Sequence, residues 1–398
     1  MGNKVLLIPD AYFGNSSGAI VAQIAKKLLL SIGNEVSVFS TDMTEDAIES
    51  DGTHLYYRTG YTGIANWRED KYIKEYEVVL QKTEATVIFT IGSITNKNLC
   101  YLEIAKKRGL KVISKIFMQD FFCMKLYAND KNGPCTRCLD KGYFEALKHK
   151  CIINNLVDYI NACNRILIRK RLEKILPKIN YVITSSDEQI GFYERFGIPK
   201  NKTIKTPLYF DVNRLNGLSS SMGNYYVGIA QNRIEKGFHF ISEILAYCDD
   251  SIRIILAYNN KEQAIKAIKE NNFQIYIDKG ILDVQYDLKW ETGLSQLVAN
   301  ARGVIIPSIW PTTTEFGLLE ALGLGKPVFT FDVGIHSEII ENGVNGFKVP
   351  LGDCKTMAMQ LNHFSNIQYA VVSAEAEILY NKLTDWRKWV SDLKQIGL

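Results

Sequence analysis

The chain has 398 residues, of which 46% are hydrophobic and 23% are charged, and its formal net charge is +4. This composition excludes a disordered or fibrous protein. A net charge this small on so long a chain does not indicate nucleic-acid binding, and we expect no nucleic-acid partner. The length exceeds what one hydrophobic core usually organises, so we expect two domains.

The N-terminus predicts a cytoplasmic protein. Its sequence, MGNKVLLIPD, holds an apolar run too short for a signal peptide or a membrane span, and the run is typical of a buried strand. We therefore expect the eight cysteines to be reduced. Two basic clusters, at Lys106–Lys111 and Arg165–Lys178, are typical of solvated helix faces, and peripheral contact with a membrane or an acceptor stays open.

The first half alternates short β-branched runs with helical patterns, which predicts a parallel sheet with crossover helices. A strand at Val5–Ile8 is followed by a Gly- and Ser-rich loop at Gly14–Gly18 and a helix at Ala19–Leu30. Further strands are expected at residues 35–39, 86–91, 111–116 and 181–184. These elements predict a doubly wound, Rossmann-like α/β domain over residues 1–212.

Between these strands lies the segment His54–Arg68, which interleaves aromatic residues with Arg and Gly and predicts a loop. Aromatic faces beside polar groups suit sugar rings. The candidate acceptor contacts are Tyr57, Arg58, Tyr61 and Trp67. A loop at the edge of the core would have a similar composition.

Four cysteines follow in a pattern that fits two kinds of structure. Cys135 and Cys138 form a close pair, and Cys123 and Cys151 lie about a dozen residues to either side. Four thiolates can hold a structural zinc ion, and reduced thiols packed in a small subdomain fit equally. In neither case do we expect catalysis to depend on them.

The second half repeats the alternation, with strands expected at residues 225–229, 252–257, 273–277, 303–306 and 327–331. It predicts a second Rossmann-like domain over residues 213–375, joined to the first through the loop Lys205–Gly223. Two facing domains of this kind would place a ligand cleft between them. The final segment, 376–398, is expected to be one helix packed on the first domain, with Trp386 and Trp389 on one buried stripe.

The most informative segment is Pro307–Val328, PSIWPTTTEFGLLEALGLGKPV, a predicted loop that runs into a helix. A helix start near Glu315–Gly317 leaves backbone N–H groups unpaired, which suits a diphosphate. Glu320 lies further along, where a carboxylate can accept hydrogen bonds from two ribose hydroxyls. Thr312 and Glu315 also fit a capping box, which needs no ligand.

This segment resembles the motif of the retaining glycosyltransferases of family four, which have the GT-B fold. The motif reads PS, a glutamate, seven residues, EA and a GKPV strand entry. Matching Pro307, Ser308 and Glu320 without gaps places Thr312 at the first glutamate, which in the family faces the donor sugar, and Glu320 at the second, which faces the ribose. Making Glu315 the stand-in for the first glutamate would require a gap.

Two neighbouring segments extend the resemblance. YVGIAQNRIEKG, at Tyr226–Gly237, is similar to the strand and R…KG loop whose arginine and lysine neutralise the donor phosphates. Lys236 matches the lysine, but Gln231 stands at the arginine, so the resemblance suggests Arg233 as a shifted replacement. DVGIHSEII resembles the glycine turn and glutamate beside the donor sugar, which assigns that carboxylate to Glu338.

The resemblance implies that residues 1–212 form the acceptor-side domain, although it is looser in this half of the chain. The Gly14–Gly18 loop stands where the family brings backbone N–H groups near the diphosphate. The family's His-Asp pair reads Gln119 and Asp120 here. Asp120 is a candidate partner of the acceptor hydroxyl, and a structural turn role stays open.

Together the resemblance implies a metal-independent glycosyltransferase that moves a hexosyl or deoxyhexosyl group from a UDP- or GDP-sugar, with retention of configuration. The acceptor would be a hydroxyl of a carbohydrate or of a lipid-linked or protein-linked glycan. The implied catalytic residues are Arg233, Lys236 and Asp120. The implied donor-binding residues are Gly14, Gly18, Gly228, Thr312, Glu315, Phe316, Gly317, Glu320 and Glu338. A nucleotide-sugar-binding protein without transfer activity, suggested by Thr312 and Gln119, and a GT-B epimerase or phosphorylase are the alternatives.

Overall fold

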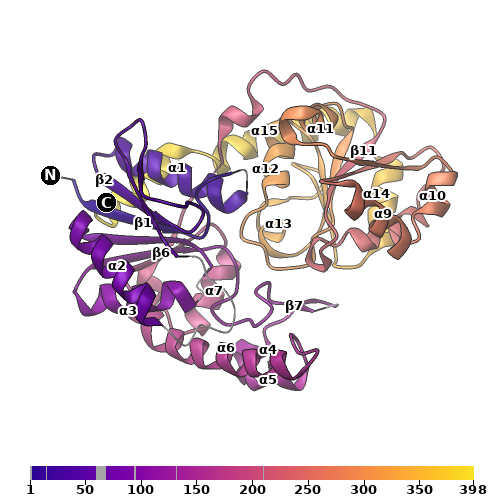
Figure 1. The fold of residues 1–398 in the computed structure, drawn as a ribbon. Helices are drawn as coiled ribbons and strands as arrows, with labels where there is room; N and C mark the ends of the chain where they lie inside the picture. The colour runs from indigo at the N-terminus through magenta and orange to yellow at the C-terminus, as the bar shows by residue number, and fades with distance from the viewer. Residues whose placement is uncertain (1, 15, 60–68, 94–95, 131, 209) are drawn as a thin grey trace. The chain divides into compact units, whose positions relative to one another are not determined.

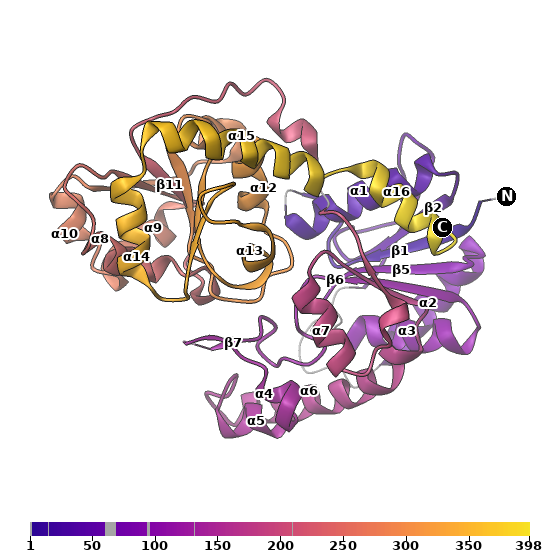
Figure 2. The ribbon, with the colours of Figure 1, turned by 180° about the vertical axis from the view of Figure 1, so that it is seen from behind.

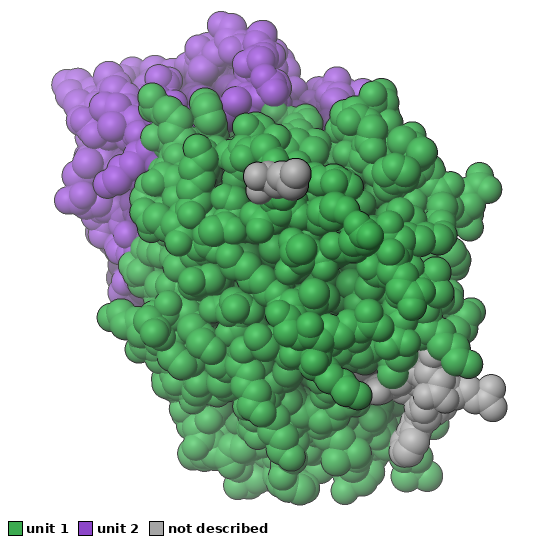
Figure 3. Space-filling model, turned by 90° about the vertical axis from the view of Figure 1, so that its left-hand side faces the viewer, with its two compact units in different colours: residues 1–128, 135–211, 385–398 green, residues 129–134, 212–384 purple. Residues whose placement is uncertain are grey.

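The computed structural model describes residues 2–14, 16–59, 69–93, 96–130, 132–208 and 210–398. The chain divides into two units, which Figure 3 colours separately. The first contains Met1–Ala128, Cys135–Asp211 and Asp385–Leu398, and the second contains Asn129–Pro134 and Val212–Thr384. Each unit is built around its own sheet (Figure 1). The assignment of the acceptor to the first unit and the donor to the second stays a prediction.

The sheet of the first unit has eight strands in the order β10-β9-β6-β5-β1-β2-β4-β3. The strands are β1 (Lys4–Pro9), β2 (Glu35–Ser40), β3 (Ala47–Ile48), β4 (His54–Tyr57), β5 (Val87–Gly92), β6 (Lys111–Ile116), β9 (Tyr181–Thr184) and β10 (Thr203–Lys205). All neighbours pair in parallel except β3 and β4. Nearly every residue of β1, β2, β5 and β6 is buried, as expected of a parallel sheet.

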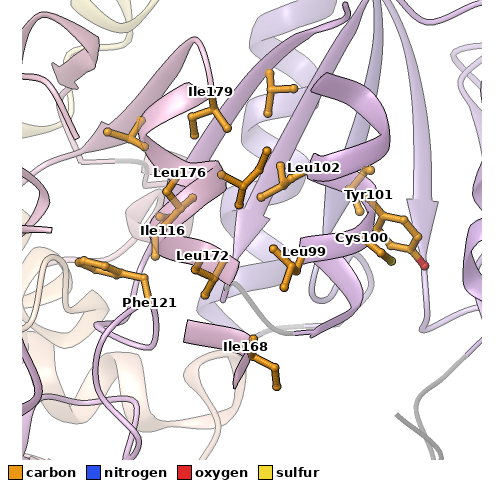
Figure 4. Packing of buried hydrophobic residues seen from close by; sticks show 14 of the residues in the cluster. Leu99, Cys100, Tyr101, Leu102, Ile116, Phe121, Ile168, Leu172, Leu176 and Ile179 are labelled. Carbon is orange, nitrogen blue, oxygen red and sulfur yellow. The ribbon is translucent and has the colours of Figure 1, made fainter. Parts of the chain in front are cut away.

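The core of this unit forms where its helices pack against the sheet. The helices are α1 (Ser17–Ser31), α2 (Glu69–Thr83), α3 (Asn96–Lys107), α4 (Arg137–Lys141), α5 (Phe144–Lys148), α6 (Leu156–Ile175), α7 (Asp187–Arg195) and α16 (Trp386–Gln395). Figure 4 shows one part of this core, where Leu99 and Leu102 of α3 meet Ile116 of β6 and Ile168 and Leu172 of α6. The apolar inner face of α6 thus packs into the core of its own unit.

The end of the chain differs from the single helix predicted there. Helix α15 ends at Leu383 and α16 begins at Trp386. Trp389 is 2% exposed, and its indole N–H donates to the Pro207 carbonyl oxygen at 2.9 Å. The predicted shared stripe is wrong for Trp386, which is the first residue of α16 and is 61% exposed.

The sheet of the second unit has the order β13-β12-β11-β14-β15-β16, and every pair is parallel. The strands are β11 (Tyr226–Ala230), β12 (Ile254–Tyr258), β13 (Leu282–Tyr286), β14 (Gly303–Ile306), β15 (Val328–Phe331) and β16 (Phe347–Val349). The helices are α8 (Ile241–Leu245), α9 (Lys261–Glu270), α10 (Gln274–Asp278), α11 (Leu294–Ala299), α12 (Phe316–Gly323), α13 (Gly334–Ile339), α14 (Cys354–His363) and α15 (Asn366–Leu383) (Figure 2). This is the Rossmann strand order, which reverses between β11 and β14.

One predicted strand of this unit is wrong. Residues 273–277 were expected to be extended, but they lie at helix α10. Phe273 is buried and Ile275 is 58% exposed, a spacing that suits a short helix better than a strand. The strand comes after Gly280, at β13. Asp283 and Gln285 interrupt its apolar residues, so the sequence pattern did not predict it.

Two short strands, β7 (Asn129–Asp130) and β8 (Gly133–Pro134), pair antiparallel as a separate small sheet. In the part of the chain that the structure describes, no helix is both long and apolar enough to cross a membrane.

Candidate functional site

The loops that follow β11, β14 and β15 lie at one edge of the second sheet, because these strands are parallel neighbours. The segments that follow these strands carry Lys236, Glu315 and His336 respectively, with His336 in the first turn of α13. The sheet order reverses between β11 and β14, and ligands of open α/β sheets bind at such a switch point, outside the carboxyl ends of the strands. The sheet topology alone therefore marks this edge as a candidate site.

Glu315 is the centre of the polar cluster at this edge. Its carboxylate lies 2.6 Å from Lys236 Nζ and accepts hydrogen bonds from Ser308 Oγ at 2.9 and 3.1 Å. His336 Nε2 lies 3.3 Å from the same carboxylate. The Glu315 side chain is 10% exposed and that of Lys236 is 17% exposed. The cluster is thus largely withdrawn from water but still open to a ligand at Lys236.

The surroundings of Glu315 keep it ionised. Burial by itself would raise the pKa of its carboxyl, but Lys236 and His336 outweigh burial and hold the pKa well below its usual range. A charged carboxylate and a lysine in contact form a fixed ion pair, which costs more to break when buried than at the surface.

His336 is oriented by the strand behind it. Its Nδ1 lies 2.7 Å from the Thr330 hydroxyl, which donates its single proton to the Ile306 carbonyl oxygen, also at 2.7 Å. This contact orients the imidazole ring so that Nε2 faces the Glu315 carboxylate. His336 is fully buried, and no motif in the sequence singled it out.

Gly237 brings the first two loops together. It has a φ of +71°, and a Cβ atom placed on it would lie 1.6 Å from the Pro307 carbonyl oxygen. The adjoining Ile309 N–H donates to the Glu235 carbonyl oxygen at 3.0 Å. The contact holds Lys236 beside the loop that carries Glu315.

Gly237→Ala is therefore expected to destabilise the protein by about 3 kcal/mol, the sum of left-handed backbone strain and a steric clash. Gly280→Ala is the matched control, because Gly280 has a φ of +70° and open space around it. Thermal unfolding should show a clearly larger loss for Gly237→Ala. Equal losses would mean that the loop contact tolerates a side chain.

Glu320 lies on α12 and is held by a residue that the sequence analysis missed. Its Oε1 accepts from Arg214 Nη2 at 2.7 Å and from Arg214 Nε at 3.2 Å. The Trp290 indole N–H donates to the Arg214 carbonyl oxygen at 3.0 Å, and the guanidinium lies over the indole ring. Burial raises the pKa of Glu320, and Arg214 opposes that shift. Because Arg214 lies far from any motif, no sequence signal pointed to it.

The loop before α12 differs from a capping box. The helix begins at Phe316 with Glu315 at the N-cap position, as the predicted helix start requires. The capping box on Thr312 is wrong, because the Thr312 hydroxyl donates to the Thr314 carbonyl oxygen at 2.7 Å instead. Thr312 is fully buried, whereas Phe316 and Gly317 are half-buried at the first turn.

The other predicted residues of this unit lie around the cluster. Arg233 is 45% exposed and forms an ion pair with the buried Glu235. Gly228 lies within β11, where Phe238 and Leu256 fill the space beside it, which indicates a packing role. Glu338 is half-buried on α13. Their contact with a donor stays a prediction.

The predicted residues of the first unit lie at different depths. Gly14 and Gly18 flank the start of α1, which Ser16 caps by accepting from the Ala19 N–H. Asp120 is 1% exposed in a turn closed by the Cys123 N–H, which donates to Gln119. This burial favours the structural role of Asp120 over an acceptor contact.

The predicted acceptor loop is wrong at its start, because His54–Tyr57 form strand β4. Tyr57 is 37% exposed, but Arg58 is 1% exposed, lies over the rings of Phe39 and Tyr101, and donates to the Pro9 carbonyl oxygen at 3.1 Å. Tyr61 and Trp67 lie outside the described residues. Acceptor contact of these four residues stays a prediction.

All eight cysteines are free. Burial, with Cys123, Cys151 and Cys135 nearby, raises the pKa of the Cys138 thiol to about 12. In the described ranges, no three or more His, Cys, Asp or Glu side chains are placed to hold a metal ion. A structural zinc ion at the four clustered cysteines stays a prediction.

In sequence, the chain matches a known protein family within the second unit. Residues 226–366 match the family model described as glycosyl transferases group 1, which covers about a third of the chain and includes the whole polar cluster. No curated protein matches the chain in sequence.

Solved structures match over both units. Sucrose-phosphate synthase from Thermosynechococcus elongatus has a TM-score of 0.70 and 13% identity over 98% of this chain and 97% of that one. HepE of Anabaena, in complex with UDP, has a TM-score of 0.69 and 15% identity over 100% and 98%. WaaG, a glycosyltransferase involved in lipopolysaccharide biosynthesis, has a TM-score of 0.65 and 14% identity over 98% and 99%.

The chain has the GT-B fold, with two Rossmann-like domains. At these identities the structural likeness speaks to the fold alone. The family match over the polar cluster supports sugar transfer as the chemistry of the chain.

Proposed function

We propose that the protein is a retaining glycosyltransferase that transfers a sugar from a nucleoside diphosphate sugar to an acceptor hydroxyl. The observation that carries the proposal is the cluster of Lys236 and Glu315 at the switch point of the second sheet, beside the start of α12. A cation and the backbone N–H groups of a helix start at that place suit a diphosphate. HepE has been solved with UDP and with UDP-glucose, which supports a uridine nucleotide here.

In this proposal Lys236 contacts the donor diphosphate while Glu315 keeps the lysine in place. Because Glu315 is anchored by Ser308 and lies against His336, the ammonium group is fixed before the donor arrives. Glu315 and His336 are then positioning residues. Glu315 also brings a carboxylate into a site where the family's first glutamate is replaced by the buried Thr312.

The reaction breaks the bond between the sugar C1 and the phosphate oxygen and forms a bond between C1 and the acceptor oxygen on the same face. The acceptor proton passes to the departing diphosphate. Charge therefore develops on the leaving group, where Lys236 and the first turn of α12 would stabilise it. The acceptor is a hydroxyl of a carbohydrate or of a lipid-linked or protein-linked glycan.

A donor screen tests the proposal. Uridine, guanosine and deoxythymidine diphosphate sugars are supplied with simple sugar acceptors, and products are detected by mass spectrometry. We expect a glycosylated product, without added metal, from one class of donor. Nucleotide-sugar binding without any product would instead indicate a binding protein, and neither binding nor product would exclude the proposed function.

Arg233→Ala is expected to lower turnover by about tenfold and donor affinity by less. The reason is that Arg233 would exchange its ion pair with Glu235 for a contact with the negative charge that develops on the leaving diphosphate. Initial rates at saturating donor measure the effect. Arg253→Ala is a control, because its Nη1 bonds only backbone carbonyl oxygens, those of Asp250 and Ile252, among the described residues. Turnover within about twofold of the wild type would make Arg233 a solvated loop residue.

A further inference from the structure

The outer face of α6 exposes large apolar side chains. Leu156, Ile160 and Leu167 are 75%, 51% and 59% exposed. Their spacing of four and seven residues places them on one side of the helix. The opposite side, with Ile168 and Leu172, packs into the core (Figure 4). The apolar stripe is therefore not needed to attach α6 to its own unit.

Helix α5 and the first turn of α6 expose further apolar side chains. Helix α5 packs against α6, as both ribbon views show (Figures 1 and 2). Its Phe144 is 68% exposed, and Val157 and Tyr159 at the start of α6 are about half exposed. We call Phe144, Leu156, Val157, Tyr159, Ile160 and Leu167 the α6 surface.

Positive charge is concentrated in the segment of the chain that carries the α6 surface. Residues 137–175 contain nine Lys and Arg against four Asp and Glu, a net charge of +5, whereas the whole chain carries +4. The rest of the chain is therefore slightly negative. Lys170 and Lys174 are exposed and lie on the same side of α6 as the apolar stripe, nearer the end of the helix.

The acidic side chains of this segment are already engaged within the unit. Asp140 pairs with Arg195, Glu145 lies 3.3 Å from His149, and Glu173 accepts from the Tyr143 hydroxyl at 2.7 Å. Asp158 accepts from the Asn154 N–H at the start of α6. Among the described residues, no ion pair involves Lys141, Lys150, Lys170 or Lys174. These exposed lysines are available to an external anion.

We infer that the α6 surface docks on an anionic lipid bilayer. Apolar side chains on one helix face enter the boundary between headgroups and acyl chains, and the lysines reach the lipid phosphates with their long stems. The exposed lysines favour an anionic lipid surface over a second copy of the chain, because the same cations would repel each other across a symmetric dimer. The inference goes beyond the proposed function, and its test needs no transfer activity.

Cosedimentation of the full chain with vesicles tests the inference. We expect binding to vesicles of phosphatidylglycerol and phosphatidylcholine, little binding to phosphatidylcholine alone, and a decrease with salt. Leu156→Asp/Leu167→Asp and Lys170→Glu/Lys174→Glu should each reduce the bound fraction by about tenfold, because each removes one of the two contributions to interfacial binding. All these side chains are exposed, so thermal unfolding should remain close to that of the wild type.

The matched control is Ile367→Asp/Ile378→Asp on α15, where the side chains are 81% and 60% exposed. This variant should bind vesicles like the wild type. No binding to anionic vesicles, or equal losses in the α15 and α6 variants, would overturn the inference. A wild-type dimer in analytical ultracentrifugation that the α6 variants dissociate would assign the surface to a second copy and would also overturn it.

Discussion

Lys236→Ala is expected to lower turnover at saturating donor by about 100- to 1000-fold, the usual effect of removing one group that stabilises a developing oxyanion. Donor affinity should fall less, because the charge on the leaving diphosphate grows as the bond to the sugar breaks. Initial rates and calorimetric titration of the donor measure the two effects. The separation matters because removing a lysine that merely binds the donor would lower donor affinity and leave turnover at saturating donor unchanged.

Lys236→Ala also leaves the Glu315 carboxylate buried beside one fewer cation, which costs on the order of 3 to 5 kcal/mol of stability. Lys236→Ala/Glu315→Gln is therefore the necessary control. The amide can still accept from Ser308, so the double variant should recover stability but not turnover. Recovery of turnover would show that Lys236 serves only to neutralise Glu315, and the proposed contact with the diphosphate would be wrong.

Glu320→Gln is expected to weaken binding of the nucleoside diphosphate by about 10- to 100-fold, the equivalent of roughly 1.5 to 3 kcal/mol for a hydrogen bond to a charged group. Both contacts with Arg214 use Oε1, and among the described residues no hydrogen bond reaches Oε2. We propose that this second oxygen accepts a hydrogen bond from the ribose. Glutamine retains an oxygen for Arg214, so the fold should be preserved.

Inorganic pyrophosphate separates the ribose contact from a general loss of the site, because it carries no ribose. Calorimetry should show unchanged pyrophosphate binding in Glu320→Gln, whereas Glu341→Gln, at an exposed position of the same unit, should leave both ligands unaffected. Equal weakening of pyrophosphate and nucleotide would mean that the substitution disturbs α12 rather than a ribose contact.

Much of the fold could be predicted because parallel strands are short, apolar and bounded by turns. Lys111–Ile116, Tyr181–Thr184 and Gly303–Ile306 are strands with the predicted bounds. The errors arise where local pattern and tertiary context disagree. Residues 273–277 have an apolar run but form α10, and β13 was missed because polar residues alternate along an edge strand.

The candidate site could be predicted only in part. The helix start at Glu315 and the lysine of the KG pair follow from local sequence, and the structure brings them within 2.6 Å. Neither Arg214 nor His336 could be found in this way, because each acts through a contact between segments distant in the chain. The buried position of Arg58 was equally hidden, since its aromatic neighbours come from β2 and α3.

Hydrogen–deuterium exchange of the full chain, with and without the nucleoside diphosphate that the donor screen identifies, tests the central claim most directly. The account predicts slower amide exchange in peptides that cover residues 232–238 and 308–320, where the loop of Lys236 and the first turns of α12 lie. Unchanged exchange in both peptides at a saturating nucleotide concentration would contradict a donor site at the carboxyl edge of the second sheet.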